Sequence, residues 1–522
     1  MRITLGGESW KEHAPTLNNV AAPFLLSPYE LSLMVNIRAD GPTLVKRGGT
    51  VAVGTAANAS KPLGLWLAYR ADGTATPVRY QLGGNGTFYY STDNTTWPST
   101  TLTGWSTTLY PSAAVYQGSI FWCNGSDTPK RSSLSSPTTI STWGTLPTDF
   151  NPSWVIAYGN RLYAGGDTST PNRVHFSDFG DPLTWQEQNF YSFPDNQNGG
   201  SPVAAAEMPK GIILFGADFV GTLTGYSELD HELQPWPRRS ALLSKRGICN
   251  MGGSAAYGTP EGPELFDGTS MPRPLDAFHR VNWGDANMVD PNDIWFLRTG
   301  PWMMRCYFKS RGLTKAAASA TVSVGRLVAS MYAYVVSFLT RSTTPPSAIS
   351  HYYEYNFVTD SWSGPHDGAH SCGEWETFLH GDRQYAWVAG VATGLVMKAD
   401  QEVYTDADNS SKPYEAIVRT GGFGLDPSKK YKINQVDLVC STSAMASGVR
   451  VRVYGEGQTH KFLVEETGDR SATSVDNAQF CTISIPLQER NVMTKVPQVE
   501  IRELSTNAFV IYGITIDVEE VV

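Results

Sequence analysis

A short unit that recurs along the middle of the chain constrains the fold more than any other feature of the sequence. It consists of an apolar strand, a two-residue turn that contains glycine, and a second strand rich in aromatic residues. Two copies are AAVYQGSIFWC at residues 113–123 and WVIAYGNRLYA at residues 154–164. Short strands that recur every 40–50 residues or so are typical of a β-propeller, in which each blade is a small antiparallel sheet.

Further strands of this kind extend the series over residues 61–405. A chain of 522 residues is longer than one hydrophobic core usually serves, and repeated blades solve this because each buries its faces against its neighbours. The spacing is least regular over residues 232–315. The sequence therefore predicts an all-β fold with a β-propeller of six or seven irregular blades. The strands behind this count lie at residues 78–82, 87–91, 161–164, 173–177, 211–216, 220–225, 351–356, 384–390 and 394–397.

The two ends of the chain differ from this repetitive part. Residues 1–60 have the pattern of an irregular lead-in, and the polar stretch DADNSSK at residues 406–412 is typical of a linker. Residues 412–522 contain 12 basic and 14 acidic residues, and the strands at 449–454 and 509–518 alternate in polarity. Alternation with a period of two indicates a sheet with one face in water. We therefore expect a separate C-terminal antiparallel β-sandwich over residues 412–522.

The way the ring of blades closes gives a further prediction. A propeller whose first and last blades are not joined exposes unpaired backbone groups along a sheet edge. Strand-like pieces at residues 43–45 and 50–53 precede the first blade, and the last blade ends near residue 397. We expect a strand from residues 30–60 to complete the blade formed near residues 350–400.

The charge balance argues against a protein that grips nucleic acid by its phosphates. The formal net charge is −9, and only 17% of the residues are charged. Proteins that bind phosphate backbones usually carry a basic excess or a basic stripe. The densest positive cluster, Lys429-Lys430-Tyr431-Lys432, is short and is interpreted as a solvated loop beside a strand.

The cysteines are scattered and suggest no cofactor. They lie at positions 123, 249, 306, 372, 440 and 481, and no two of them have the CxxC spacing. The absence of CxxC pairs excludes zinc ribbons and dithiol redox motifs. A disulfide framework is not expected in a chain of this length. We expect the chain to be assembled in a reducing cytoplasm with its thiols free.

Neither the start of the chain nor its longest apolar segment predicts a membrane association. Residues 1–7 open no apolar run of the kind that begins a signal peptide. The longest apolar segment, residues 327–339, is interrupted by Ser330 and Ser337 and is too short to span a bilayer. We expect this segment to form one or two buried strands.

One cluster has the residue types of a metal site. His366, His370, Cys372 and Glu374 fall within nine residues. The surrounding sequence GPHDGAHSCG is rich in glycine and predicts a loop, so the helical spacing that would bring the two histidines together does not apply. We interpret this segment as a polar loop between blades.

Two stretches resemble the Asp-box turn of sialidase-type propellers. STDNTTW at residues 91–97 lacks the central glycine of that pattern and is one residue short, and residues 177–185 form a similar but longer stretch. We interpret both as hairpin turns capped by Ser and Asp side chains, with the tryptophan packed between blades. Sialidase chemistry also requires an arginine cluster, a Tyr/Glu pair and an acid, and the spacing does not indicate that such residues converge.

Two acidic stretches complete the candidates. DADNS at residues 406–410 begins like a calcium loop, but Ser411 and Ile417 stand where the EF-hand pattern requires glycine and glutamate. Glu228, Asp230, His231 and Glu232 are interpreted as a solvated loop. The sequence therefore predicts no catalytic, cofactor-binding or metal-binding residue.

A resemblance to a known family lies in LSLMVNIRADGPTLVKRGGTVAVG, residues 31–54. Asn36-Ile37-Arg38, the Asp40-Gly41 turn and Lys46-Arg47-Gly48-Gly49 follow the order of asparagine, strand, turn, and Lys/Arg-Arg-Gly. Together with the blade-like residues 160–227, this pattern resembles the tail nozzle or packaged-DNA stabilisation proteins of short-tailed bacteriophages. The resemblance covers the opening segment and the blades.

The resemblance implies a structural virion protein with no enzyme activity and no cofactor. Members of this family form a homohexameric tail hub that extends the DNA channel, retains the packaged genome until DNA ejection, and anchors other tail components. The implied partners are further copies of the chain, head–tail adaptor proteins, tail fibre or tail-tip proteins, and packaged DNA that passes without sequence-specific binding. The implied location is the virion tail, after assembly in the host cytoplasm.

The net charge of −9 further predicts that the channel of this ring is neutral to acidic. Each lysine or arginine that faced the DNA would attract phosphate and slow its passage. Two other interpretations stay open. One is a glycan-binding or glycan-cleaving propeller similar to sialidases, which an axial pocket with perturbed carboxylates would favour. The other is a cellular β-propeller interaction scaffold.

Overall fold

The structure is a computed structural model that describes most of the chain. The residues described are 1–6, 10, 13–18, 25–27, 29–56, 60–70, 77–192, 201–216, 219–225, 230–236, 242–275, 294–309, 350–368, 370–376, 384, 386–391, 393–401, 415–423, 425–441, 449–455, 462–467, 473–475, 480–503 and 508–521. The predicted buried strands at 327–339, the linker at 406–412 and Glu228 lie outside these residues.

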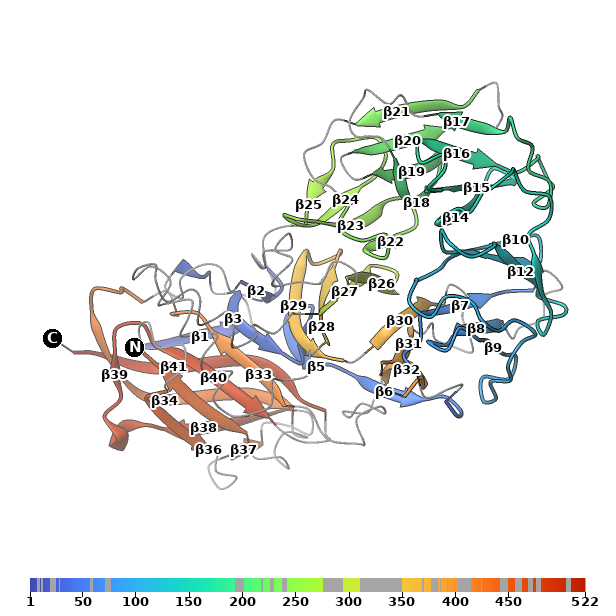
Figure 1. The fold of residues 1–522 in the computed structure, drawn as a ribbon. Coiled ribbons are helices and arrows are strands. Elements are labelled where there is room, and N and C mark those ends of the chain that lie inside the picture. The colour runs from blue at the N-terminus through green and yellow to red at the C-terminus, as the bar shows by residue number, and fades with distance from the viewer. Residues whose placement is uncertain are drawn as a thin grey trace, which may run out of the picture.

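The described strands between residues 49 and 401 form seven small antiparallel sheets, which follow one another around a ring (Figure 1). This confirms the predicted all-β propeller. Blade 1 contains β7 (Gly64–Ala68), β8 (Val78–Leu82) and β9 (Phe88–Ser91), and blade 2 contains β10 (Ser112–Tyr116), β11 (Ser119–Cys123), β12 (Lys130–Ser133) and β13 (Ile140–Thr142). Blade 3 contains β14 (Trp154–Tyr158), β15 (Arg161–Gly165), β16 (Arg173–Phe176) and β17 (Phe190–Ser192). Blade 4 contains β18 (Pro202–Met208), β19 (Gly211–Gly216), β20 (Val220–Thr224) and β21 (Glu232–Trp236). Blade 5 contains β22 (Ile248–Asn250), β23 (Ala255–Thr259), β24 (Gly262–Phe266) and β25 (Arg273–Pro274). Blade 6 contains β26 (Trp295–Gly300), β27 (Met303–Lys309), β28 (Ser350–Asn356) and β29 (Ser361–Asp367). Blade 7 contains β30 (His370–Trp375), β31 (Ala386–Gly390), β32 (Val396–Gln401) and β6 (Gly49–Ala52).

The repeated sequence unit forms the inner hairpin of a blade. β10 and β11 pair with Tyr116 opposite Ser119, so only Gln117 and Gly118 lie in the turn. Both turn residues have positive φ, 45° and 69°. A two-residue turn with two positive φ values matches the twist of the strands it joins, which explains why glycine recurs there. The β14–β15 hairpin repeats this geometry.

The ring is closed by a strand from near the start of the chain. β6 pairs antiparallel with β32, with Ala52 opposite Met397 and Val51 opposite Lys398. A strand of residues 30–60 therefore completes the blade built from residues 370–401, as the sequence predicted. The edge of β32 is covered by this pairing and exposes no free ladder.

The rest of the described chain forms two sheets that pack face to face beside blade 6 (Figure 1). One sheet has the order β37-β38-β34-β41-β5-β4, with β1 on β41 and β39 on β34, and the other has the order β2-β3-β33-β40-β35-β36. Their bounds are β1 (Arg2–Gly6), β2 (Thr16–Leu17), β3 (Glu30–Val35), β4 (Ile37–Asp40), β5 (Thr43–Lys46), β33 (Ala416–Thr420), β34 (Lys430–Ser441), β35 (Arg450–Tyr454), β36 (Val464–Thr467), β37 (Thr473–Val475), β38 (Phe480–Pro486), β39 (Met493–Thr494), β40 (Gln498–Glu503) and β41 (Val510–Val521). The expected sandwich is thus present, but residues 412–522 do not form it alone, because both sheets also contain strands from residues 2–46.

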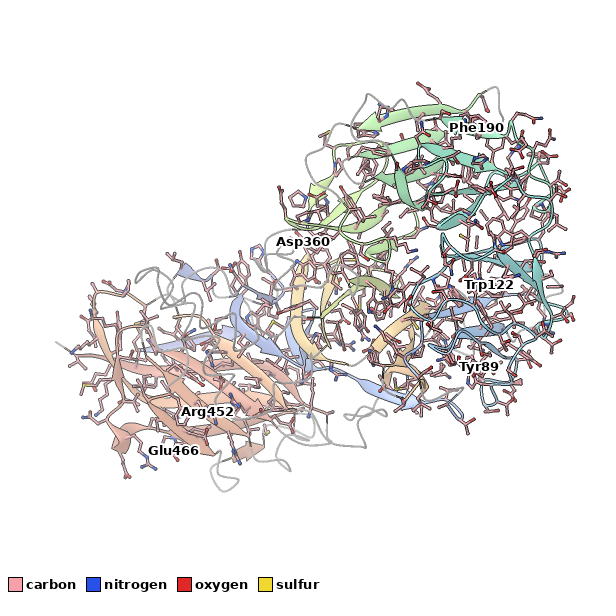
Figure 2. All side chains as sticks on the ribbon, viewed as in Figure 1. Tyr89, Trp122, Phe190, Asp360, Arg452 and Glu466 are labelled. Carbon is pink, nitrogen blue, oxygen red and sulfur yellow. The ribbon has the colours of Figure 1, made fainter. Side chains whose placement is uncertain are left out.

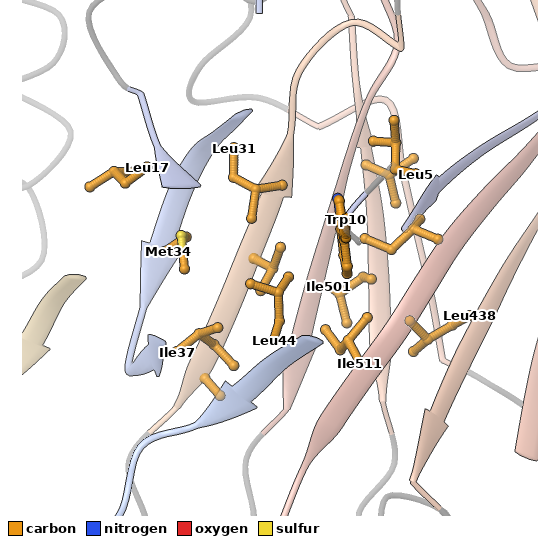
Figure 3. Packing of buried hydrophobic residues seen from close by; sticks show 14 of the residues in the cluster. Leu5, Trp10, Leu17, Leu31, Met34, Ile37, Leu44, Leu438, Ile501 and Ile511 are labelled. Carbon is orange, nitrogen blue, oxygen red and sulfur yellow. The ribbon is translucent and has the colours of Figure 1, made fainter. Parts of the chain in front are cut away.

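The core of the sandwich is built from both ends of the chain. Figure 3 shows Leu44 of β5 packed among Leu438, Ile501 and Ile511, which come from strands after residue 430, and all four side chains are buried. The interpretation of residues 1–60 as an irregular lead-in is therefore wrong. Residues 2–46 supply five strands to the two sheets, because a sheet takes its partners by edge pairing and not by closeness in sequence.

The irregular region between residues 232 and 315 holds the last strand of blade 4, the whole of blade 5 and the first half of blade 6. Its strands are short, with β22 of three residues and β25 of two, which explains why the repeat is hard to see there. The number of blades formed by the described residues is seven, within the predicted range.

Candidate functional site

The segment that carries the family resemblance forms the junction between sandwich and propeller. Asn36 separates β3 from β4 and has φ 54°, a left-handed conformation that asparagine tolerates better than most residues. Its side-chain amide donates to the carbonyl of Glu415, at 2.9 Å. Its side-chain oxygen accepts from Nε of Arg47, at 3.1 Å, and its backbone carbonyl accepts from the Arg47 N–H. Asn36, at the corner between the two sandwich sheets, therefore holds Arg47, which lies between β5 of the sandwich and β6 of the propeller.

Lys46, at the end of β5, is held in the sandwich by a buried ion pair. Its Nζ lies 2.7 Å from Oε2 of Glu503 on β40, and both side chains are at most 1% exposed. Burial lowers the pKa of Lys46, and the hydrogen bond that its ammonium donates to Glu503 opposes that shift. A buried pair of this kind costs desolvation but fixes the register, because either charge alone would be unsatisfied.

Gly48 brings the chain into the closing blade. A Cβ at this position would lie 2.7 Å from the carbonyl oxygen of Gln401 and 2.8 Å from the carbonyl carbon of Asp400. Only glycine permits so close an approach of two backbones. The Lys46-Arg47-Gly48 sequence thus has one anchor in the sandwich, one in the corner, and one against β32.

A network of buried and half-buried charges joins blade 6, blade 7 and the sandwich at this junction. Arg305 of β27 donates to both carboxylate oxygens of Asp400 in β32, at 2.5 and 2.6 Å, and to Glu354 of β28 at 3.0 Å. Arg38 of β4 lies 3.7 Å from the same Asp400. Burial opposes ionisation of Asp400, but the guanidinium groups of Arg305 and Arg38 outweigh it and lower the pKa of that carboxyl.

The other side of blade 7 is also attached through a buried arginine. Arg79 of β8 in blade 1 is fully buried, and its guanidinium carbon lies 4.1 Å from the ring centre of Trp387 in β31. Glu376 accepts from the indole N–H of Trp387 at 3.0 Å and stands 3.7 Å from Arg79. Burial lowers the pKa of Arg79 to about 10, against the opposing effect of Glu376. Both faces of the closing blade therefore carry charged contacts.

The interface between blades 1 and 2 is built differently, from aromatic rings. Trp122 of β11, labelled in Figure 2, is buried. Its ring centre lies 4.9 Å from those of Tyr80 and Phe88 in blade 1. Such pairs combine large buried area with edge and tilted ring contacts. Blade 7, which recruits a strand from outside the ring, thus differs from this interface in its charged contacts.

A group of cationic and aromatic side chains lies on the propeller axis. Arg246, in the segment leading to blade 5, has its guanidinium carbon 3.6 Å from the ring centre of Tyr110, which precedes blade 2. The same guanidinium lies 5.6 Å from the Trp295 ring of blade 6 and donates to the carbonyl of Ser371 in blade 7. Lys61, which precedes blade 1, stands 5.3 Å from the Tyr110 ring. A side chain that reaches blades 2, 6 and 7 at once must cross the axis.

Glu374 and Cys372 lie on β30, an inner strand close to this axial group. Burial raises the pKa of Glu374 to about 7, and its charge also acts on the thiol of Cys249 in blade 5. Burial raises the pKa of Cys372 to about 11, while Arg246 nearby favours its thiolate. A carboxyl that titrates near neutral pH can exchange a proton under physiological conditions.

The two histidines of the predicted metal-type cluster have other partners. Nε2 of His366 lies 3.2 Å from the Ser363 hydroxyl, and Nδ1 of His370 lies 3.2 Å from the hydroxyl of Tyr307. Both imidazoles pack near Tyr352, with ring centres at 5.0 and 6.5 Å. Among the described residues, no three His, Cys, Asp or Glu side chains are arranged to hold a metal ion.

The segment at residues 364–373 joins blades 6 and 7, as expected, but the prediction that it forms a loop throughout is wrong. His366 lies in β29, the outer strand of blade 6, and His370 begins β30 of blade 7. The glycines that suggested a loop have packing reasons: a Cβ on Gly373 would lie 2.6 Å from the Trp387 carbonyl oxygen. Glycine in a strand often marks such close approach.

The two turns that resemble Asp-boxes are capped hairpin turns, as expected. The Asp93 carboxylate accepts from the N–H groups of Thr95 and Thr96, at 2.8 Å each. Asp181 accepts from Leu183 N–H at 2.9 Å in the longer turn. The tryptophans that follow pack between blades, since Trp97 joins a cluster with Trp387 of blade 7 and Trp185 stacks 5.5 Å from Trp143 of blade 2.

Two polar stretches interpreted as solvated loops have ordered roles. Lys430 to Lys432 begin strand β34, and the Lys429 ammonium pairs with Glu520 of β41 at 3.0 Å. His231 packs in blades 3 and 4, where its ring nitrogens contact the hydroxyls of Tyr163, at 2.8 Å, and Tyr191. The exposure predicted from polarity is confirmed for Lys429, Lys430, Asp230 and Glu232. Strand pairing and aromatic neighbours give these stretches the order that a solvated loop would lack.

The residues of the charged junction network escaped sequence reasoning. Arg79 and Arg305 stand inside apolar strands, in VRYQL and MMRCYFK. A charge within an apolar strand is a usable signal, because such a residue must find a partner or leave the core. The sequence does not identify Glu376 or Asp400 as those partners.

Comparisons with known proteins place the chain in no family. No family model matches it, and no curated protein matches it. The WD40 β-propeller domain of Doa1 is similar in structure, with a TM-score of 0.41 and 9% identity, over 68% of this chain and 98% of that domain. YCF48 from Cyanidioschyzon merolae has a TM-score of 0.39 and 11% identity, over 68% of this chain and 98% of that one. YCF48 bound to D1 peptide has a TM-score of 0.35 and 10% identity, over 67% of this chain and 96% of that one. At such loose superposition, the assignment of the propeller depends on the strand pairing itself.

Among the described residues, none form a helix long and apolar enough to cross a membrane.

Proposed function

We propose that this protein is a structural component of a bacteriophage tail, a nozzle or hub whose copies form a ring around the path of the DNA. The observation that carries the proposal is the position of residues 31–54. The segment that resembles the phage nozzle proteins is the one that turns at Asn36 between the two sandwich sheets, leaves the sandwich after Lys46 and closes blade 7. Its characteristic asparagine, lysine, arginine and glycine each have a role in that junction.

Rigid coupling of two domains suits a load-bearing ring. Packaged DNA presses on the tail until ejection, so a subunit that retains it must resist movement of its domains against each other. Here the β27, β32 and β4 strands share one charge network, and Trp362 of β29 donates to the Thr16 hydroxyl at 3.0 Å. The Arg38–Asp400 contact and the hydrogen bond from the Trp362 backbone N–H to Thr16 both join the sandwich to the propeller. Contacts of this kind oppose hinge motion between the two domains.

The proposed assembly is a homohexamer below the portal and adaptor. It contacts head–tail adaptor proteins on one side and tail fibre or tail-tip proteins on the other, and it lets DNA pass without sequence-specific binding. Each chain has a net charge of −9, which favours a ring channel that does not hold phosphate. The protein is made in the host cytoplasm, belongs to the virion tail and carries out no catalysis.

Negative-stain images of the purified full-length chain, together with its mass by light scattering, test this proposal. We expect ring particles of six copies, and antibody labelling at the tail of the parent virion. Duplex DNA should not bind tightly at about 0.15 M salt. A stable monomer that labels no virion would overturn the proposal.

A second candidate, a glycan-binding propeller, is favoured by one observation. Glu374 has its pKa raised to about 7 near an axis that also holds Arg246 and Lys61. A perturbed carboxyl beside cations and aromatic rings is a common feature of ligand sites. Glycan-array binding by the native chain that disappears in Glu374→Gln, with the melting temperature unchanged, would favour this candidate over the tail scaffold.

A further inference from the structure

Two cysteines stand directly opposite each other in the sandwich. Cys440 of β34 and Cys481 of β38 are register partners in an antiparallel strand pair. Their Sγ atoms lie 3.8 Å apart, and both side chains are fully buried. The two residues are 41 positions apart in the sequence, so this proximity depends on the fold alone.

The backbone geometry of such a pair suits a disulfide. Residues opposite each other in antiparallel strands have Cα atoms about 4.5 or 5.5 Å apart. Disulfides span Cα separations of about 4.4–6.8 Å, with sulfurs about 2.05 Å apart. Rotation of the two side chains about their Cα–Cβ bonds is therefore enough to bring the sulfurs together, and the strands need not separate.

The other cysteines of the chain are not placed in this way. In the described strand pairs Cys123 faces Ser112, Cys249 faces Ala256, and Cys372 faces Ala389. Cys306 faces aromatic residues on both of its neighbouring strands. Only Cys440 and Cys481 are register partners among the described strands, so oxidation should be selective.

We propose that Cys440 and Cys481 form an intramolecular disulfide when the protein meets an oxidising medium, with a low-molecular-weight disulfide such as oxidised glutathione as the oxidant. One cysteine thiolate attacks a glutathione sulfur, which forms a mixed disulfide and releases one glutathione thiol. The second cysteine thiolate then attacks the mixed disulfide, which forms the Cys440–Cys481 bond and releases the second glutathione thiol. Two protons leave the protein thiols and two glutathione thiols result, so the exchange is balanced.

The position of the pair explains when the reaction can take place. Cys481 lies next to the edge of the sheet, because Val475 of the three-residue strand β37 is its other register partner. Burial raises the pKa of Cys440 well above that of an exposed thiol, so the closed sheet protects it. Oxidation therefore takes place during folding, or slowly in the native protein through opening of the β37–β38 edge.

The bond would stabilise the sandwich as a unit. It closes a loop that includes β35 and β36 of one sheet and β37 of the other. A cross-link that closes a long loop restricts the unfolded chain and raises the melting temperature. The sandwich would then unfold more easily while the two thiols are reduced, and would resist unfolding better once they are oxidised.

Peptide mapping of the full-length protein tests the proposal without any mutation. The native protein is incubated with oxidised glutathione, then alkylated, digested without reduction and analysed by mass spectrometry. We expect a peptide pair linked through Cys440 and Cys481, a fall from six to four titratable thiols after denaturation, and a melting temperature higher by several degrees. Reduction with dithiothreitol should reverse all three.

Two control variants keep the test specific. Cys440→Ala should lose the linked peptide and the oxidant-dependent rise in melting temperature, whereas Cys123→Ala should keep both. If Cys440→Ala fails to fold, the peptide map of the unmodified chain still decides. Six titratable thiols after incubation in mild denaturant that opens the β37–β38 edge, or a linkage between other cysteines, would overturn the proposal.

Discussion

The guanidinium of Arg305 in blade 6 binds both carboxylate oxygens of Asp400 in blade 7, at 2.5 and 2.6 Å. Both hydrogen bonds come from one nitrogen, Nη2, while Nε of the same guanidinium donates to Glu354. Hydrogen bonds between ionised partners are shorter and stronger than those between neutral groups. Arg38 from the sandwich approaches the same carboxylate. This one pair therefore links the last two blades and, through Arg38, the second domain.

Asp400→Leu should destabilise the propeller by about 3–5 kcal/mol, because it leaves Arg305 buried with one of its carboxylate partners missing. The measurement is a urea unfolding curve of the full-length chain, followed by tryptophan fluorescence. Glu520→Ala is the matched control, since it breaks the exposed pair with Lys429 and should leave the curve unchanged. Equal midpoints for Asp400→Leu and the unmodified protein would contradict the importance of the network.

Gly48→Ala should weaken ring closure, because the new Cβ would lie 2.7 Å from the Gln401 carbonyl oxygen. Hydrogen exchange should become faster at the amides of β6 and β32, with little change in blades 2 and 3. Gly253→Ala is the matched control, because the nearest atom to its new Cβ would be 3.8 Å away. Unchanged exchange in β6 would show that the closing strand tolerates the methyl group.

Acid should destabilise blade 3 through His175. The ring is buried, neither of its nitrogens has a hydrogen-bond partner among the described residues, and Phe150 lies 4.5 Å from it. Burial, together with Arg173, lowers its pKa to about 4, although the carboxylates of Asp167 and Glu187 oppose this shift. The neutral ring is required in the folded state, so its contribution is complete above the unfolded pKa of about 6.5 and is lost as the pH falls toward 4.

The expected loss from His175 is about 2 kcal/mol between pH 7 and pH 5. Melting temperatures at the two pH values, for the unmodified protein and for His175→Phe, measure it. The variant has no imidazole to protonate, so it should lose less stability on acidification. An identical pH dependence for the two proteins would rule out His175 as the sensitive group.

Trp122→Ala should cost about 3–5 kcal/mol, because it removes a buried ring that fills the interface between blades 1 and 2. Trp302→Ala is the control, since that side chain is 60% exposed and should have little effect. Chemical unfolding of the two variants in parallel provides the comparison. A small effect at Trp122 would mean that the interface refills the cavity.

Local features of the fold were predictable from the sequence. The hairpins at Tyr116–Ser119 and Tyr158–Arg161 depend on neighbouring residues and on turns that require positive φ, so their signal is contained in a few positions. The capped turns before Trp97 and Trp185 were predictable for the same reason, because Asp and Ser cap the backbone beside them. Closure by residues 30–60 followed from a general rule, that an open sheet edge is unfavourable.

The contribution of the first 46 residues to the sandwich was not predictable in this way. β5 pairs with β41, with Leu44 opposite Ile511, across more than 460 positions. Any apolar strand of suitable length can pair with β41, so nothing in the local sequence selects β5. The loop prediction around His366 was too long for a related reason, since Gly364 and Gly373 serve close contacts with neighbouring strands and not turns.

The sequence by itself determined the units of this protein: short hairpins, their aromatic strands, and the junction segment with its Asn36, Lys46 and Gly48. Only the tertiary structure decided how the units meet, including the Arg305–Asp400 pair, the side chains that cross the propeller axis, and the facing Cys440 and Cys481. The physical reason is range. Turn and strand preferences act over a few residues and leave a pattern in the sequence, whereas burial and charge pairing act between segments whose proximity exists only after folding.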